Sequence, residues 1–260
     1  MLQSMLKPFM SVFVLGVFCL CVIHIAEAQI VLDFEDGSLD AWEVVDEAPE
    51  NLGDLGPSTW EIRDSQLGLD GSALYQSSNI WGTPGDTMLM GTFIIYRGER
   101  FSNFILDVDI AAADNDAMGL VWAYEGTDRH YRVMMINDVW PDPPLDGFQG
   151  PMMIAHKRIS NAEPWYELLE VVKDTYVPYT EGGERLHWSL EVIDGNFTLT
   201  REDGLSITGS DADYADGYVG IQLYAQQAEF DNFAVIPLDS TAVDAKGKLA
   251  TAWGQMKTVR

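Results

Sequence analysis

The sequence predicts an all-β protein folded as a two-sheet antiparallel jelly-roll sandwich. The first reason is alternation: in residues 104–110 and again in 186–192, apolar side chains occupy every second position. A period of two places one set of side chains on each face of a strand. The second reason is that Gly, Asp and Asn, which favour turns, separate these segments. Many short strands divided by such turns are typical of sandwiches and jelly rolls.

The elements follow one another along the chain as strands and turns. Asp194-Gly195 predicts a tight hairpin turn into a strand that begins near Phe197. Residues 161–173 are compatible with a helix that has Pro164 in its first turn, and equally with a strand. Residues 49–57 and 137–151 are expected to be loops, and loops of such length are often functional. The other expected strands are residues 31–35, 59–63, 88–96, 104–110, 118–125, 130–136, 152–159, 186–192, 218–224 and 229–236.

The first 28 residues are predicted to be a cleaved signal peptide. Lys7 is followed by an apolar stretch over residues 9–25 and by Ala-Glu-Ala at 26–28, the pattern that signal peptidase recognises. The apolar stretch is short for a membrane span. Both cysteines, Cys19 and Cys21, lie in this segment. The mature chain is therefore expected to contain neither a disulfide nor a cysteine-based site.

Residues 29–238 are expected to form one domain, and residues 239–260 a C-terminal tail. A chain of 232 residues (260 − 28) buries about 70% of its unfolded surface, so a core alone can stabilise it. The tail carries Lys246, Lys248, Lys257 and Arg260, and this basic composition departs from that of the acidic domain. We expect the tail to lie outside the sandwich.

The strongly acidic balance excludes some classes of partner. The formal net charge of the chain is −26, and such a field repels nucleic acid and anionic membrane surfaces. It favours cations, above all calcium, whose ligands are carboxylate and carbonyl oxygens. An equally valid interpretation is that the acidity only maintains solubility.

Four segments occur in the order and spacing of a known family. They are the acidic cluster 114–116 with the strand that follows it, residues 130–135, residues 185–192, and residues 214–233, which end in Phe230-Asp231-Asn232-Phe233. Together they resemble the C-terminal lectin-like domain of thrombospondins, within the concanavalin A-like superfamily. The resemblance implies a lectin-like sandwich. The calcium repeats and cysteines of thrombospondins are absent, so it implies nothing about their receptors.

The two ends of the sandwich carry a further resemblance. The opening Asp33-Phe34-Glu35-Asp36-Gly37 and the closing Phe230-Asp231-Asn232-Phe233 are similar to the end strands of many carbohydrate-binding sandwiches. Those strands pair, and a structural calcium often lies where they meet. The resemblance implies Glu35 and Asp231 as leading calcium ligands, with Asp114 and Asp116 as a second candidate cluster. The alternative is that these acids point into water or cap turns.

No catalytic set stands out in the sequence, so we expect the protein not to be an enzyme. Asp107 and Asp109 share a face, but no glutamate completes a glycosidase set on that strand. The mature histidines lack metal-binding spacing, and His187 is expected to be solvated or to face a groove. The acidic run that begins at Asp211 has Gln222 where a calcium-binding EF-hand loop has glutamate, so a turn is preferred. The sequence therefore predicts no catalytic residues.

Aromatic residues in or beside loops are the candidate sugar platforms. Flat aromatic rings stack on the apolar C–H faces of sugars. Aromatics within strands, namely Trp60, Trp122 and Trp188, are expected in the core instead. The alternative for the loop set is that its members pack beneath their own loops. The loop set consists of Trp81, Trp140, Trp165, Tyr166, Tyr176 and Tyr179.

Three functions are compatible with these features. The favoured one is a secreted, non-catalytic module that binds glycans or matrix and is stabilised by calcium. The second is a secreted glycoside hydrolase that uses a carboxylate pair from residues 137–183, for example Glu167 and Glu170, which share a face if that segment is helical. The third is a piece of a surface assembly attached by its basic tail. The expected location is extracellular, with the periplasm or cell surface as further possibilities.

Overall fold

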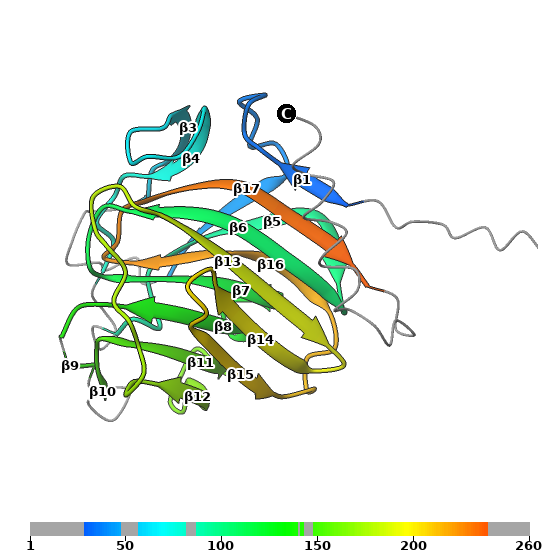
Figure 1. The fold of residues 1–260 in the computed structure, drawn as a ribbon. Coiled ribbons are helices and arrows are strands. Elements are labelled where there is room, and N and C mark those ends of the chain that lie inside the picture. The colour runs from blue at the N-terminus through cyan, green and yellow to red at the C-terminus, as the bar shows by residue number, and fades with distance from the viewer. Residues whose placement is uncertain (1–28, 48–56, 82–86, 140, 143–147, 239–260) are drawn as a thin grey trace, which may run out of the picture.

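The computed structural model describes residues 29–47, 57–81, 87–139, 141–142 and 148–238, which form two antiparallel sheets packed face to face (Figure 1). The prediction of an all-β, two-sheet jelly-roll sandwich is confirmed. The signal peptide, Trp140 and the tail lie outside the described residues. Within the described part, no helix has the length and apolar character that a membrane span requires.

The first sheet has eight strands in the order β15-β14-β13-β6-β17-β4-β3, with β1 also paired to β17. Its strands are β1 (Ile30–Leu32), β3 (Trp60–Asp64), β4 (Ser72–Gln76), β6 (Phe104–Ala112), β13 (Arg185–Ile193), β14 (Asn196–Arg201), β15 (Ser206–Ser210) and β17 (Ala228–Pro237).

The second sheet has seven strands in the order β12-β11-β8-β7-β16-β5-β2, and a small third sheet pairs β9 with β10. The strands are β2 (Trp42–Asp46), β5 (Thr92–Phe101), β7 (Ala117–Gly126), β8 (Arg129–Ile136), β9 (Pro141–Asp142), β10 (Phe148–Gln149), β11 (Met152–Arg158), β12 (Tyr166–Val172) and β16 (Gly217–Tyr224).

The main core lies between the two large sheets. Trp188 and Leu190 of β13 and Leu120 and Trp122 of β7 belong to one buried cluster, to which both sheets contribute alternate residues. Burial of this apolar surface stabilises the fold by about 25 cal/mol per Å² removed from water. The prediction that Trp60, Trp122 and Trp188 are core residues is confirmed by their burial.

The first and last strands pair, as the sequence indicates. Ile30, Val31 and Leu32 of β1 lie opposite Val235, Ala234 and Phe233 of β17, respectively. The register of β17 against β6 shifts between Asp231 and Ala234, which marks a β-bulge at this end of the strand. The bulge places the acidic residue Asp231 beside the turn that follows β1, and this junction is one corner of the molecule.

Some elements differ from the sequence prediction. Strands β2, β4 and β15 lie outside the predicted strands, because each has only five residues, too few to establish alternation. The predicted loop 137–151 contains the two-residue strands β9 and β10. Residues 88–91 form a turn rather than the start of a strand: Gly91 has φ of 128°, and a Cβ there would lie 2.1 Å from the Leu223 carbonyl oxygen. The ambiguous segment 161–173 contains the strand β12 and not a helix. The hairpin turn at Asp194-Gly195 is confirmed, with positive φ at both residues.

Deleting residues 239–260 is expected to leave the unfolding temperature unchanged. The described fold ends at Leu238, which is buried and donates its backbone N–H to the Asn103 carbonyl oxygen at 2.8 Å. A chain that ends at Leu238 retains this closing contact. Thermal unfolding of the truncated chain, followed by circular dichroism, tests the expectation. A fall of several degrees would show instead that the tail packs on the sandwich.

Candidate functional site

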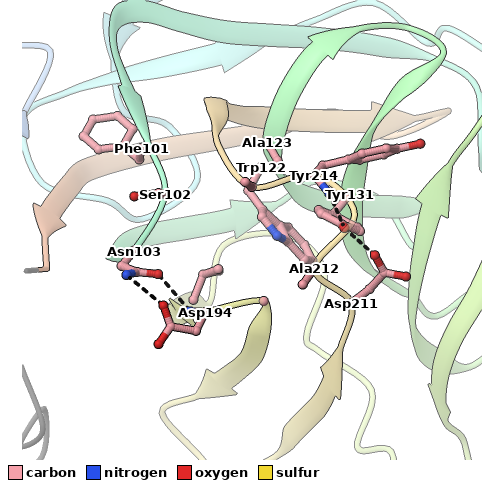
Figure 2. A pocket seen from close by; sticks show the side chains of 13 residues that line it. Phe101, Ser102, Asn103, Trp122, Ala123, Tyr131, Asp194, Asp211, Ala212 and Tyr214 are labelled. Atoms are coloured by element: carbon pink, nitrogen blue, oxygen red, sulfur yellow. Dashed lines mark hydrogen bonds between the residues drawn. The ribbon is translucent and has the colours of Figure 1, made fainter. Parts of the chain in front are cut away.

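A pocket with a volume of about 420 Å³ opens at one end of the sandwich (Figure 2). Both sheets and three connections contribute to its wall: the β5–β6 turn, the β13–β14 turn and the β15–β16 loop. The backbone of β7 bends here, where the register against β8 and β16 shifts and Ala123 has φ of 49°. The bulge re-aims the end of the strand toward the pocket.

Three aromatic residues form one side of the pocket. The rings of Trp122 and Tyr131 stack with centroids 5.3 Å apart, and the Tyr214 ring lies 5.0 Å from that of Tyr131. Phe197 supports the Trp122 ring from the core at 5.2 Å. Trp122 and Tyr131 are almost fully buried, whereas Tyr214 is half-buried and lies at the rim. The aromatic wall is thus held rigidly by contacts within the protein.

Carboxylate and amide groups line the pocket at two places: Asn103 and Asp194 lie together at one, and Asp211 lies beside Tyr131 at the other (Figure 2). Asn103 accepts a hydrogen bond from the backbone N–H of Asp194 at 2.8 Å, and this contact fixes the β13–β14 turn against the β5–β6 turn. Tyr131 donates its hydroxyl to Asp211 Oδ1 at 2.5 Å and accepts the backbone N–H of Tyr214 at 3.0 Å. These hydrogen bonds, drawn in Figure 2, orient the polar groups before any ligand arrives.

Asp211 is held in its ionised form. Burial acts to raise its pKa, but hydrogen bonds from the Tyr131 hydroxyl, the Asp213 backbone N–H and Lys157 outweigh burial and keep the pKa below its ordinary value. Lys157 Nζ lies 3.0 Å from Asp211 Oδ2 and also pairs with Asp213 and Glu167. The pocket therefore presents a hydrogen-bond acceptor rather than a proton donor at this position.

The aromatic residues proposed from the sequence do not gather at one place. Trp81 and Tyr166 pack, half-buried, against a smaller cluster on the outer face of the seven-stranded sheet, and Trp165 is half-buried just before β12. Tyr176 and Tyr179 differ from the expectation: they are only 8% and 4% exposed and belong to the main core. Their hydroxyls explain this position, since each finds a partner beneath the surface, in Asn137 and the Asp116 carbonyl respectively.

Acidic residues from two strands and a turn meet at the β1–β17 corner. Asp109 of β6 lies opposite Asp231 of β17 and His187 of β13, and the Asn232 side-chain amide donates to both carboxylates at 2.9 Å. Glu35 accepts the backbone N–H of Ser72 at 2.9 Å. Glu35 lies close enough to Asp231 for its charge to raise the pKa of that carboxyl, and the calcium role of the two residues stays a prediction.

The carboxylates at this corner repel one another, and this repulsion changes the pKa of Asp231. Burial and the negative charges of neighbouring carboxylates raise its pKa to about 7, although the hydrogen bond from the Asn232 backbone opposes the shift. The carboxylates responsible are those of Asp109, Asp33 and Glu35. A search of the described residues finds no group of three or more His, Cys, Asp or Glu side chains that is arranged to hold a metal ion.

Asp114 and Asp116, the second candidate metal cluster, take part in hydrogen bonds that hold their own turn in place. The backbone carbonyls of Asp114 and Asp116 both accept hydrogen bonds from the Gln226 side chain, at 2.7 and 3.1 Å. Gln226 also accepts the backbone N–H of Asp114, so a buried amide ties this turn to the start of β17. This arrangement gives the 114–116 turn a structural role.

The face that carries Asp107 and Asp109 is covered, contrary to the expectation of a solvated surface. Both aspartates are buried, and His187 is half-buried with its Nδ1 2.8 Å from Asp109 Oδ1. Arg185 of β13 forms an ion pair with Asp109. The register places His187 of the same strand directly opposite Asp109, so the His187 side chain covers this carboxylate. This contact keeps the histidine out of the core but within the corner.

Comparison with known proteins gives likenesses of fold only. No family model and no curated protein matches the chain. A carbohydrate-binding module, CBM66 from Bacillus subtilis, has a TM-score of 0.49 at 17% identity, covering 74% of this chain and 93% of that one. The GH43 protein BlXynB from Bacillus licheniformis has a TM-score of 0.47 at 15% identity, with 79% and 39% covered. A mutant of congerin II has a TM-score of 0.41 at 13% identity, with 52% and 93% covered.

Proposed function

We propose that the protein is a secreted, non-catalytic module that binds glycans in the pocket lined by Trp122, Tyr131 and Tyr214. The observation that carries the proposal is the pairing of an aromatic wall with fixed carboxylate and amide groups in one open pocket. The pocket volume of about 420 Å³ lies within the span of about 300–1,000 Å³ that small-ligand sites occupy.

The chemistry of sugars fits both kinds of group in such a pocket. A pyranose ring presents apolar C–H groups on its faces and hydroxyls around its edge. The C–H groups favour the flat aromatic wall. The hydroxyls favour Asn103, Asp194 and Asp211, since an ionised carboxylate accepts hydrogen bonds that are stronger than neutral ones. Hydrogen bonds within the protein already fix these groups, which lowers the entropy cost of binding.

A binding role accounts for the acidic groups of this pocket better than glycosidase chemistry does. A glycosidase requires a carboxyl group with a raised pKa to protonate the leaving group. At Asp211 the pKa is lowered, with Tyr131 and Lys157 among its partners. Glu167, a candidate for the hydrolase alternative, forms an ion pair with Lys157 at 2.7 Å. The likeness of the sequence to the thrombospondin lectin-like domain is a further reason to propose adhesion to glycans or matrix.

A glycan array is the test of this proposal, and Tyr214→Ala is the variant to compare with the wild type. Loss of the rim aromatic is expected to weaken binding about tenfold, equivalent to ~1.4 kcal/mol. Tyr218→Ala is the matched control, because Tyr218 is also half-buried beside arginines but lies outside the pocket. An array without any retained glycan would overturn the proposal. Release of reducing sugar from polysaccharides would favour the hydrolase instead.

Calcium is proposed as the structural ion of the β1–β17 corner, with Asp231 and Glu35 as leading ligands. The carboxylates that raise the pKa of Asp231 supply the oxygens that this ion prefers, and backbone carbonyls of the adjoining turn would complete six to eight ligands. When bound, the ion would neutralise the repulsion and join the first strand to the last. Asp109, which lies opposite Asp231, is proposed as a further ligand.

A further inference from the structure

A buried group of charged side chains lies on the outer face of the seven-stranded sheet, away from the pocket. In the pairing of β8 with β11, Arg132 lies opposite His156 and His130 lies opposite Arg158. Glu47, just beyond β2, joins them. All five side chains are buried, and Arg132 and both histidines are 0% exposed. These five residues are called the buried arginine cluster below.

The two arginines of the cluster differ in how their donors are satisfied. Arg158 donates to the Ser160 carbonyl at 2.8 Å and to Asn161 Oδ1 at 3.2 Å, and it lies 3.1 Å from Glu47 Oε1. Arg132 donates only its Nε–H, to His156 Nε2 at 3.0 Å. Among the described residues, neither of its buried terminal nitrogens has a hydrogen-bond partner, and Glu47 lies 3.8 Å from Nη1, beyond hydrogen-bond reach.

The charge of the cluster is also unbalanced. Burial, and then the charge of Arg132, lower the pKa of both His130 and His156 well below the ordinary value, so both rings are neutral. Among the described residues, two guanidinium groups then face one carboxylate. Burial and the charge of Arg158 lower the pKa of Arg132 to about 9, although the nearby Glu47 opposes the shift. Water could accept hydrogen bonds from the terminal nitrogens of Arg132, but only an anion could accept them and also balance the positive charge of the cluster.

We propose that the buried arginine cluster is a second ligand site, which binds a carboxylate group at the terminal nitrogens of Arg132. A carboxylate carries the single negative charge that the cluster lacks. Its two oxygens match the planar fork of a guanidinium, which forms bidentate pairs with this group. The carboxylate belongs either to a small organic acid or to an acidic sugar, and both sources share the chemistry that Arg132 recognises.

The segment that packs over the buried arginine cluster contains flexible side chains that can move to admit a ligand. Met90 Sδ lies 3.8 Å from Arg158 Nη1, and the Leu89 carbonyl lies 3.4 Å from the same nitrogen, so residues 88–90 pack directly on the cluster. Methionine is unbranched and flexible, and it repacks at small cost. Entry of a carboxylate through this segment requires it to shift away from Arg158, the neighbour of Arg132 in the cluster.

Thermal unfolding and calorimetric titration, with ionic strength held constant, test the proposal. Glucuronate represents the acidic sugar, propionate the free acid, and glucose the neutral sugar. Saturable binding of glucuronate alone assigns the site to acidic sugars, and binding of both acids assigns it to carboxylates in general. Glucose is expected to leave this site unaffected. If neither acid binds, the cluster is purely structural and the proposal is overturned.

Variants locate the binding within the chain. Arg132→Met leaves Glu47 paired with Arg158 and is expected to weaken carboxylate binding at least tenfold. Arg201→Met is the matched control, since Arg201 is equally buried but already paired with Asp203. Glu47→Gln, which raises the cluster charge, is expected to tighten binding severalfold and serves if Arg132→Met does not fold. Unchanged binding in Arg132→Met, or weaker binding in Glu47→Gln, overturns the assignment. Tyr214→Ala should bind carboxylates normally, which separates this site from the pocket.

Discussion

Replacement of Glu229 by alanine is expected to destabilise the protein by about 2–3 kcal/mol, the range for hydrogen bonds to a charged group. Glu229 is fully buried near the start of β17 and accepts hydrogen bonds from the side chains of Arg63 and Ser65, at 2.9 and 2.6 Å. It also accepts the backbone N–H groups of Gln66 and Leu67. Alanine would remove the acceptor of all four donors, whose residues are half-buried or, for Gln66, exposed, so water satisfies part of the loss.

The measurement is the midpoint of thermal unfolding, which is expected to fall by about 5–10 °C for a domain of this size. Glu61→Ala is the matched control, because Glu61 lies on the same hairpin but is exposed, and its loss should be nearly neutral. A small effect in Glu229→Ala would mean that residues 65–67 adopt another arrangement at little cost. The β3–β4 turn that Glu229 organises also holds Glu35 through Ser72, so the variant should weaken calcium binding too.

Calcium is expected to raise the unfolding temperature of the wild type by about 5–10 °C. At a free concentration of about one hundred times Kd, binding to the folded state alone contributes ~2.7 kcal/mol, and each kcal/mol corresponds to about 2–4 °C for a domain of this size. Asp231→Asn removes a proposed ligand and should abolish the effect. Asp174→Asn, which removes an exposed acid elsewhere, is the control and should respond to calcium like the wild type.

In the absence of calcium, Asp231→Asn is expected to be more stable than the wild type, and the size of this difference depends on pH. An aspartate has a pKa of about 3.9 in the unfolded chain, and in the folded state burial and neighbouring charges raise the pKa of Asp231 to about 7. Its protonation therefore stabilises the fold fully below about pH 4, and this contribution is lost as the pH rises through about 7.

Asparagine cannot ionise, so Asp231→Asn should become progressively more stable than the wild type between about pH 4 and 7 in the presence of EDTA. Unfolding temperatures of the two proteins across this range provide the measurement. If the difference between them does not change with pH, Asp231 is not the site of repulsion. If calcium and EDTA give the same melting curve for the wild type, the calcium proposal fails.

The sequence predicts what depends on local periodicity. Alternation in residues 104–110 and 186–192 identifies strands whose inner faces form the core, and the turn at Asp194-Gly195 has the positive φ values that its residues favour. The pairing of residues 30–32 with β17 agrees with the resemblance of the two ends of the chain to known end strands. These features need no knowledge of which strands are neighbours elsewhere in the sheets.

The candidate sites could not be predicted in the same way, because they depend on register between distant strands. Asn103, Asp194 and Asp211 come from three separate turns, and no spacing in the sequence relates them. Tyr176 and Tyr179 have the composition of a surface platform, yet partners beneath the loop draw them inward. The buried arginine cluster did leave a signal: polar residues 130, 132, 156 and 158 share one parity in β8 and β11, although Arg129 and Lys157 at the other parity obscure it. Only the pairing of β8 with β11 turns that signal into a site.

The position of β17 determines when the chain can fold. This last strand lies in the middle of the eight-stranded sheet and pairs with β6, β4 and β1, all of which precede it by more than a hundred residues. The chain must close these long loops before the strands can form the contacts that stabilise the sheet. Folding of this topology is therefore slow. A growing chain that has not yet reached Ala228 lacks the strand that joins both halves of the sheet. This sheet therefore cannot close until β17 has been synthesised, and the acidic corner that β17 forms with β1 is among its last parts to assemble.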